Sequence, residues 1–224
     1  MEIEPIAHIH TAFPTKFGIP RQSGLVPELE GTIVFEPQYR DPDALRGISG
    51  FSHLWLLWGF SEAQRKDFSP LVRPPRLGGN EKRGVFATRS PFRPNSIGLS
   101  SVELVSVDQT NSQGTVLRVR GADLMDGTPI YDIKPYISYT DVHKDAVCGF
   151  ASNPDEGLLD VVIPAEYEQV LGPDAEVLSK VLERDPRPAY HNDPDRVYEM
   201  RFSCWDVRFK VAEGTLTVVS VKRA

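Results

Sequence analysis

The stretch Ser100–Leu124, "SSVELVSVDQTNSQGTVLRVRGADL", carries the clearest fold signal in the sequence. Apolar and polar residues alternate through "SVELVSV" and again through "TVLRVR". Such alternation is typical of strands that turn one face to a core and the other to solvent. The residues "NSQG" between the two runs have the composition of a tight turn. The stretch therefore predicts a β-hairpin.

Strand-like segments flank this hairpin on both sides. Before it, "IEPIAHIHTAF" and "GTIVFEP" alternate in the same way, and "FSHLWLLWGF" is apolar enough to be expected buried on both faces. After it, "TPIYDIKPYI", "YEMRFSCWDVRFKVA" and "TLTVVSVKR" read as further strands. Many short strands with little helix predict a barrel or a sandwich.

Helical signals are few. The clearest helix is expected within Pro164–Asp185, whose second half spaces its apolar residues along one helical face. "DPDALRGI" predicts one helical turn, with Asp41 as N-cap and Pro42 at the first helical position.

The composition changes near residues 141–160, which are polar and poorly periodic. We therefore expect a mainly β protein with three parts. Residues 1–140 form a small β-barrel domain, 141–160 a linker, and 161–224 a smaller α+β domain.

Composition excludes several classes of protein. No apolar run in the 224 residues approaches the roughly 18 to 20 needed to span a bilayer, and the amino-terminal residues lack a signal-peptide pattern. Cys148 and Cys204 lie far apart and outside any CxxC pattern, which argues against a disulfide framework or a zinc site. We therefore expect a cytoplasmic protein that is not associated with a membrane.

The net charge of −6 is unevenly distributed. Between Arg65 and Arg93 there are eight lysines and arginines but only two acidic residues, Asp67 and Glu81. A concentrated positive field of this kind can steer an anionic partner, although a solvated surface loop would explain the charges equally well.

The histidines give little support for metal or hydrolytic chemistry. His8 and His10 share one strand face and form a candidate metal pair, but no third ligand lies nearby in the sequence. His53 sits within an apolar strand and is expected in the core. No GxSxG, GxGxxG or GxxxxGK[ST] motif is present. No bound metal is expected.

Four loop-like segments are richer in glycine, proline and charged residues than scaffolding requires. They are "KFGIPRQSGL" (Lys16–Leu25), "VRPPRLGGNEKRG" (Val72–Gly84), "GVFATRSPFRPNSIGLS" (Gly84–Ser100) and "GADLMDGTPIYDIKPY" (Gly121–Tyr136). Any one of them is most simply a turn. Four together indicate a binding site on loops held by rigid strands.

These segments also resemble a known family. "KFGIPRQSGL", "GISGFSHLWLLWGF", "VRPPRLGGN", "GVFATRSPFRPNSIGLSSVEL", "DLMDGTPIYDIKPY" and "DPRPAYH" occur in the order of the YaeB/TsaA-like, or TrmO, family. The resemblance extends over nearly the whole chain, to the C-terminal "CWDVRFKV".

The resemblance implies an S-adenosylmethionine-dependent tRNA methyltransferase, built on a small β-barrel and working as a homodimer. The methyl group would go to N6 of the adenosine at tRNA position 37, which already bears a threonylcarbamoyl group. The alternatives are a non-catalytic RNA- or ligand-binding barrel, a methyltransferase with another acceptor, and, more remotely, a metal-dependent hydrolase using His8 and His10.

The resemblance also suggests site residues. Cofactor contacts fall on Arg21, Gln22, Ser23, Gly24, Ser61, Glu62, Arg89, Leu99, Ala122, Asp123, Leu124 and Met125. Leu99 and Leu124 would supply apolar walls, and Asp123 would accept hydrogen bonds from the ribose hydroxyls or the adenine amino group. The candidate proton acceptors are Asp126, Asp132 and Tyr190. The arginines expected at the RNA backbone are Arg73, Arg76, Arg83 and Arg93.

Overall fold

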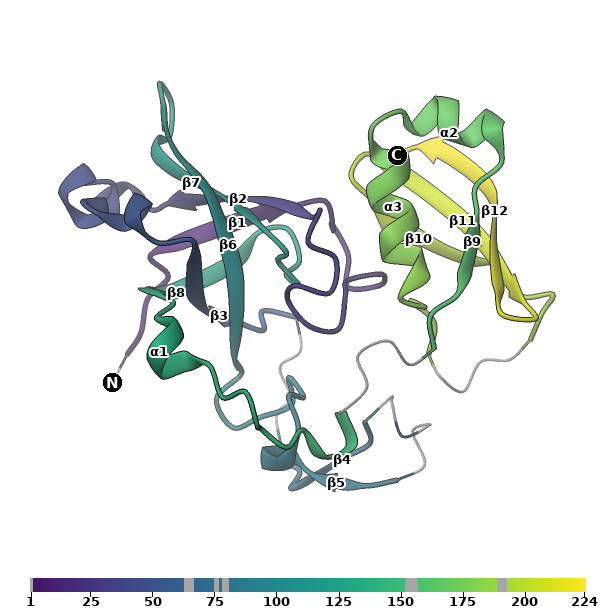
Figure 1. Cartoon of the computed structure of the whole chain (residues 1–224), viewed down its shortest axis with the longest axis horizontal. Coiled ribbons are helices and arrows are strands. Elements are labelled where there is room, and N and C mark those ends of the chain that lie inside the picture. The colour runs from purple at the N-terminus through teal and green to yellow at the C-terminus, as the bar shows by residue number, and fades with distance from the viewer. Residues whose placement is uncertain (1, 63–66, 75–76, 78–80, 152–156, 189–192) are drawn as a thin grey trace.

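The computed structural model describes residues 2–62, 67–74, 77, 81–151, 157–188 and 193–224. Six strands close into an antiparallel barrel in the order β1-β2-β7-β6-β3-β8, with β8 pairing back to β1 (Figure 1). The barrel strands are β1 (Ala7–Thr11), β2 (Glu30–Phe35), β3 (His53–Gly59), β6 (Ile97–Thr110), β7 (Gly114–Arg120) and β8 (Thr128–Pro135).

Alternating side chains fill the barrel. Every second residue of β1, β2, β3 and β7 points inward, where it is shielded from water. Burying each of these aliphatic side chains contributes on the order of 1.5–3 kcal/mol. The fully buried aliphatic side chains in the barrel include Ile9, Ile33, Leu54, Leu56 and Leu117 of these strands and Ile130 of β8.

The predicted hairpin is confirmed. Strands β6 and β7 pair antiparallel and end with Thr110 opposite Gly114, whose φ of 70° suits glycine. The sequence did not predict the irregularity between Leu104 and Ser106, where the register of this pair shifts.

The expectation for the apolar strand β3 was only half right. Its inward residues reach the core, but Trp55 and Leu57 on its outer face are half-buried. The ring of Trp55 lies 5.5 Å from that of Tyr136, and its Nε1 donates to Asp141 Oδ2 at 2.9 Å. The prediction of a core position for His53 was wrong, because its side chain is exposed at the start of the strand.

Three connections leave the barrel at one end: residues 12–29, 60–96 and 121–127, which we call the long-loop rim. The antiparallel order requires this, because β1, β3 and β7 end where β2, β6 and β8 begin. The opposite end carries the 36–52 connection with its 3-10 helices Pro37–Tyr39, Pro42–Leu45 and Ile48–Gly50. The predicted turn at Asp41 is confirmed, because this side chain accepts from the amide of Asp43 at 2.9 Å.

The 60–96 connection contains a short hairpin of its own. Strands β4 (Leu71–Val72) and β5 (Arg83–Gly84) pair antiparallel, and the 3-10 helix Val85–Ala87 follows. We call residues 67–88 of this connection the β4–β5 excursion; Figure 1 shows it extending away from the barrel before the chain returns to β6.

After the barrel come α1 (Ser138–Asp141) and the 3-10 helix Gly149–Ala151, and then a second sheet. Its strand order is β10-β11-β12-β9, with only β9 parallel to its neighbour. The elements are β9 (Asp160–Val162), α2 (Ala165–Leu171), α3 (Asp174–Glu183), β10 (Tyr198–Phe202), β11 (Trp205–Ala212) and β12 (Thr215–Arg223).

The single helix expected in Pro164–Asp185 is in fact two helices. Gly172 adopts a φ of 56°, and Pro173 cannot donate the backbone bond that would continue α2. The chain therefore turns between α2 and α3. Both helices cover the same side of the second sheet (Figure 1).

The 12–29 connection belongs to both parts of the molecule. Phe13, Val26 and Leu29 are buried in the same apolar cluster as the helices and strands of the C-terminal part. The Phe13 ring lies 5.7 Å from Phe202 in an edge-on contact, and the amide of Ser203 donates to Ala12 O at 2.6 Å. The core of the second sheet is therefore completed by a loop of the barrel.

Candidate functional site

Most of the predicted cofactor residues lie on the long-loop rim. Arg21–Gly24 belong to the 12–29 connection, while Ser61, Glu62 and Arg89 belong to the 60–96 connection. Residues 122–125 belong to the 121–127 connection. Segments separated by up to a hundred residues in the sequence thus meet at one end of the barrel, because the barrel closes.

Asp123 lies at the centre of this rim and is anchored by a relay of hydrogen bonds. Ser100 Oγ donates to Asp123 Oδ1 at 2.6 Å and accepts from Trp58 Nε1 at 3.0 Å. The Trp58 ring lies against Gly98, where an added Cβ would come within 2.3 Å of the indole. Glycine at position 98 therefore makes room for the indole that orients Ser100 toward Asp123.

Burial raises the pKa of Asp123 above its ordinary 3.8. The bond from Ser100, the amides of Asp123 and Ser23, and the charge of Arg89 act in the opposite direction but do not outweigh burial. A half-buried carboxylate with a raised pKa and several donors around it is typical of a binding or catalytic site.

Two glycines allow the first and third rim connections to touch. Gly24 donates its amide to Gly121 O at 2.9 Å, and Gly121 donates to Leu29 O at 2.8 Å. Both glycines have positive φ, 76° and 75°. A Cβ on Gly121 would lie 3.3 Å from the Cα of Gly24, so a side chain there would push the loops apart.

Polar contacts also tie the second connection to the first. Arg89 Nη1 donates to Gln22 Oε1, so these two predicted cofactor residues are in direct contact. Lys16 Nζ donates to the carbonyl of Glu62 at 2.7 Å and lies 3.7 Å from its carboxylate. Both cationic side chains are exposed, which leaves them accessible to an anionic group.

The segment 122–125 offers mainly backbone amides, rather than side chains, as candidate hydrogen-bond donors to a ligand. Ala122 and Leu124 are buried in the barrel core, so the Leu124 side chain packs inside the protein. Within the described part of the chain, the amides of Ala122, Leu124 and Met125 donate no hydrogen bond. Unused amides beside a carboxylate can recognise the ring nitrogens of a purine.

Leu99 and Asp132 lie apart from this cluster. Both are register partners of Leu57 on the outer wall of the barrel, whereas Ser100 points inward. Leu99 is 54% exposed. Asp132 accepts from the amide of Ile133 at 2.9 Å and pairs with Lys134 Nζ at 2.7 Å.

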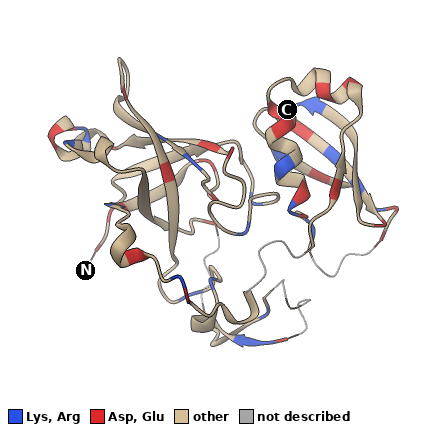
Figure 2. Cartoon of the chain, in the orientation of Figure 1, with Lys and Arg blue, Asp and Glu red and all other residues tan. Residues whose placement is uncertain are grey.

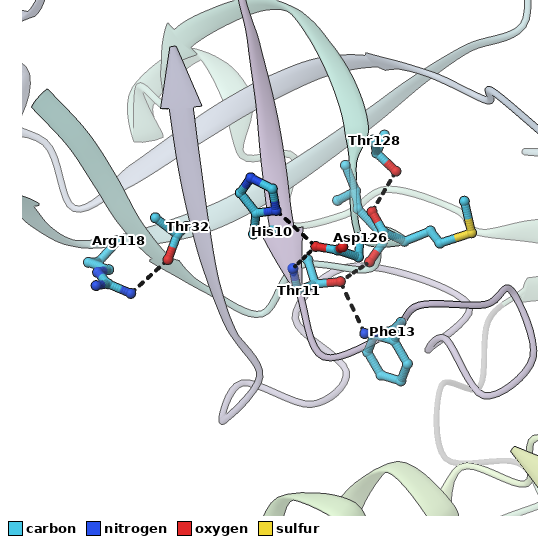
Figure 3. A network of polar contacts seen from close by, with 9 residues as sticks. His10, Thr11, Phe13, Thr32, Arg118, Asp126 and Thr128 are labelled. Atoms are coloured by element: carbon cyan, nitrogen blue, oxygen red, sulfur yellow. Dashed lines mark hydrogen bonds and ion pairs between the residues drawn. The ribbon is translucent and has the colours of Figure 1, made fainter. Parts of the chain in front are cut away.

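Asp126 fastens the third connection to the end of β1 (Figure 3). Its Oδ1 accepts from the amide of Thr11 at 3.1 Å and lies 3.1 Å from His10 Nδ1, while its own amide donates to Phe13 O at 2.8 Å. Thr11 Oγ1 donates to Leu124 O at 2.9 Å. Within the described residues, Asp126 Oδ2 accepts no hydrogen bond.

The arginines expected at RNA differ in their surroundings. Arg93 turns back on its own loop, Arg83 Nη2 lies 2.5 Å from Glu81 Oε1, and Arg73 is exposed. The predicted residues Arg76 and Tyr190 lie outside the described residues.

The two histidines considered as a metal pair have separate partners. His8 Nδ1 lies 2.7 Å from Glu36 Oε1, and His10 faces Asp126. In the part of the chain that the structure describes, no three His, Cys, Asp or Glu residues are grouped to hold a metal ion. None of the described helices is long and apolar enough to cross a bilayer.

Sequence reasoning missed Ser100, Trp58, Lys16 and Gly121. Ser100 had a detectable signal, because it occupies an inward position of an otherwise alternating strand, in phase with Val102. A polar residue at such a position must find a partner, and here the partner is Asp123. The contacts of Lys16 and Gly121 depend on barrel closure and had no sequence signal.

Comparison with known proteins agrees with this arrangement. The family model described as the tRNA-methyltransferase O N-terminal domain matches residues 8–142, and the TrmO C-terminal domain matches 159–224. A tRNA (adenine(37)-N6)-methyltransferase of Escherichia coli K12 is 37% identical over 230 residues, covering 99% of this chain and 97% of that protein.

A curated protein and a solved structure from Pseudomonas aeruginosa are also similar. RcsF of strain PAO1, described as an S-adenosylmethionine-dependent methyltransferase, is 40% identical over 215 residues, which cover 92% of this chain and 89% of that protein. A crystal structure of TrmO from this species matches with a TM-score of 0.80 at 35% identity, covering 100% of this chain and 97% of that one. The chain belongs to the TrmO family.

Proposed function

We propose that the protein is an S-adenosylmethionine-dependent methyltransferase that acts on N6 of the adenosine at position 37 of tRNA. The acceptor already carries a threonylcarbamoyl group, and the product is N6-methyl-N6-threonylcarbamoyladenosine. The observation that carries the proposal is the meeting of the three rim connections around Asp123 in a chain of the TrmO family.

The donor set at the rim suits S-adenosylmethionine. Asp123 is available to accept hydrogen bonds from ribose hydroxyls, and the amides of residues 122, 124 and 125 to recognise the adenine edge. Arg21 and Arg89 are exposed cations suited to the cofactor's carboxylate. Ser23, Gly24, Ser61 and Glu62 complete the polar rim.

When bound, S-adenosylmethionine would supply a methyl group activated by its positively charged sulfur, which is a good leaving group for transfer to N6 of the adenosine. The chain's own contribution is mainly to place donor and acceptor together, an effect that alone can be worth about 7–11 kcal/mol.

The N6 proton needs an acceptor, because a carbamoylated amine is a weak nucleophile. From the predicted set we assign this role to Asp126. It belongs to the same rim connection as Asp123, and its Oδ2 accepts no hydrogen bond from the described residues. Asp132 is less suited, because it faces the outer wall and pairs with Lys134.

The substrate is anionic, and its backbone needs cations. Arg73 and Arg83, on the β4–β5 excursion, are proposed to contact phosphates. Arg93 is proposed to order the loop that joins Arg83 to Arg89, through its bond to Thr88 O. The exposed Leu99 is proposed to contact a part of the ligand, or a part of a second subunit, that extends over the outer wall of the barrel. We further propose a cytoplasmic homodimer.

Nucleoside mass spectrometry tests the proposed function. Anticodon-loop nucleosides from a strain lacking the gene are expected to contain threonylcarbamoyladenosine without its N6-methyl derivative. The wild-type gene should restore the methylated nucleoside, and an Asp126→Asn gene should restore much less of it. Persistence of the methylated nucleoside in the deletion strain would rule out the proposal.

A further inference from the structure

The β4–β5 excursion presents two phenylalanines to solvent. Phe68 is 57% exposed and Phe86 is 72% exposed. Their ring centroids lie 6.4 Å apart with an interplanar angle of 26°, so they form one stacked pair. We call Phe68 and Phe86 the aromatic pair. The chain does not use these rings in either apolar core, and large exposed aromatics grouped together mark interaction surfaces.

Arg93 holds one member of the pair in place. Its Cζ lies 5.7 Å from the centroid of the Phe86 ring. Its Nη1 donates to the carbonyls of Val85 and Thr88, at 3.3 and 2.8 Å, on either side of Phe86. Thr88 also donates its amide and its hydroxyl to Val85 O, at 3.2 and 2.9 Å. The turn that carries Phe86 is therefore ordered before any ligand arrives, which lowers the entropy cost of binding.

The surroundings of the aromatic pair are cationic. Strand β5 places Arg83 opposite Val72, and Arg73 follows directly in the chain. Lys82 lies within the same excursion and Arg89 directly follows it. The acidic residues there are Asp67 and Glu81, while the protein as a whole carries −6. Figure 2 shows β5 among the Lys and Arg positions of this excursion. An apolar protein partner would not require this excess of positive charge.

We infer that the aromatic pair is a stacking platform for an unpaired nucleobase of the RNA substrate. Exposed aromatic rings bordered by arginines bind single-stranded RNA by stacking on the bases while the cations follow the phosphates. Phe86 precedes Arg89 by three residues, so a base stacked on the pair would lie beside the rim at which the anticodon loop is proposed to bind. This inference rests on the proposed function and names a contact of its substrate.

Substitution of Phe86 tests the platform. Phe86→Ala should weaken the affinity for an unmodified anticodon stem-loop by about 5- to 150-fold, as loss of one stacked base does elsewhere. Phe86→Trp should retain the affinity, because a larger ring also stacks. Phe51→Ala is the matched control: Phe51 is 39% exposed at the opposite end of the barrel, and its loss should leave RNA affinity unchanged.

Two further measurements distinguish an RNA contact of Phe86 from an effect on cofactor binding or on association of the chain with itself. Calorimetry should give the same S-adenosylmethionine affinity for Phe86→Ala and wild type, and sedimentation equilibrium the same molecular mass. A wild-type RNA affinity in Phe86→Ala would overturn the inference alone. A lower molecular mass in that variant would also overturn it, because the pair would then be a contact between copies of the chain. If wild-type protein binds no RNA, the proposed function fails as well.

Discussion

At the scale of single residues, Asp123 is the group whose environment most directly indicates a function. A carboxylate at this position could have been left in water, but the Trp58–Ser100 relay fixes it and burial raises its pKa. Holding an acid in an environment that disfavours its charge destabilises the fold, which is typical of a group placed to bind a ligand rather than to stabilise the protein.

The sign of this shift gives the first prediction. A raised folded pKa means that the contribution of Asp123 to folding is present below its ordinary 3.8 and is lost as the pH rises through the folded value. The Asp123→Asn variant has no group that ionises at this position, so it does not lose this stability as the pH rises. Near neutral pH the variant should therefore be at least as resistant to urea as the wild type, and an unfolding midpoint clearly below the wild-type value would contradict this.

The same substitution should have the opposite effect on binding. Only the ionised carboxylate can accept hydrogen bonds from both ribose hydroxyls that Asp123 is proposed to contact, so wild-type affinity for S-adenosylmethionine should increase as the pH rises through the folded pKa of Asp123. Calorimetry over a pH series that rises from just above 3.8 to neutrality should show this increase in the wild type and a weaker, flat affinity in Asp123→Asn. An equal pH dependence in both proteins would place the titrating group elsewhere.

At the scale of elements, the 12–29 connection performs two tasks. Its apolar residues complete the core of the second sheet, and its polar residues Arg21–Gly24 form one side of the rim. Gly18 lies against Met200 in this contact, since an added Cβ would lie 2.4 Å from Met200 Cε. Phe17 stacks on Phe209 with centroids 6.4 Å apart. The C-terminal sheet therefore shapes a loop that the cofactor is proposed to contact.

Truncating Met200 tests this coupling. Met200→Ala removes the side chain that packs against Gly18 and should cost about 2–5 kcal/mol of stability. It should also raise the KM for S-adenosylmethionine more than it lowers kcat, because the loop that binds the cofactor is loosened.

The matched control is Leu171→Ala. Leu171 is equally buried, but it lies at the end of α2, which packs against β12 and α3. A similar loss of stability with an unchanged KM would attribute the Met200 effect to the loop. Equal KM changes in both variants would mean that only the overall stability of the C-terminal sheet matters.

The sequence predicted local structure well where one strand face or one turn decides it. The hairpin around residues 111–113 and the cap at Asp41 are such cases. It failed where tertiary contacts decide. His53 sits in an apolar run but at a strand start, and Gly172 with Pro173 divides what reads as one helix.

The candidate site shows the same contrast between features decided by local sequence and features decided by tertiary contacts. Arg21–Gly24, Arg89 and Asp123 were named from family resemblance, yet their convergence depends on the closed strand order, which no single segment encodes. The separation of Leu99 from Ser100 onto opposite faces follows from strand alternation once the inward phase is known. The buried positions Gly98, Ser100 and Val102 define that phase, and the bond from Ser100 to Asp123 agrees with it.

At the scale of the whole molecule, the proposed cofactor site and the concentrated positive charge lie on neighbouring but separate parts of the chain. The proposed cofactor rim lies beside the second sheet, and the cationic β4–β5 excursion extends from the same rim (Figures 1 and 2). The acidic remainder, which brings the net charge to −6, disfavours RNA binding elsewhere on the surface. A tRNA steered to the excursion would thus be delivered to the rim.

The most direct test of this account is the reaction itself. Purified protein, S-adenosylmethionine and tRNA carrying threonylcarbamoyladenosine are incubated, and the digested nucleosides are analysed by mass spectrometry. We predict a methylated threonylcarbamoyladenosine with wild-type protein, and with Asp123→Asn the same product but a raised KM for the cofactor. Absence of the methylated nucleoside with wild-type protein, or an unchanged KM in Asp123→Asn, would contradict it.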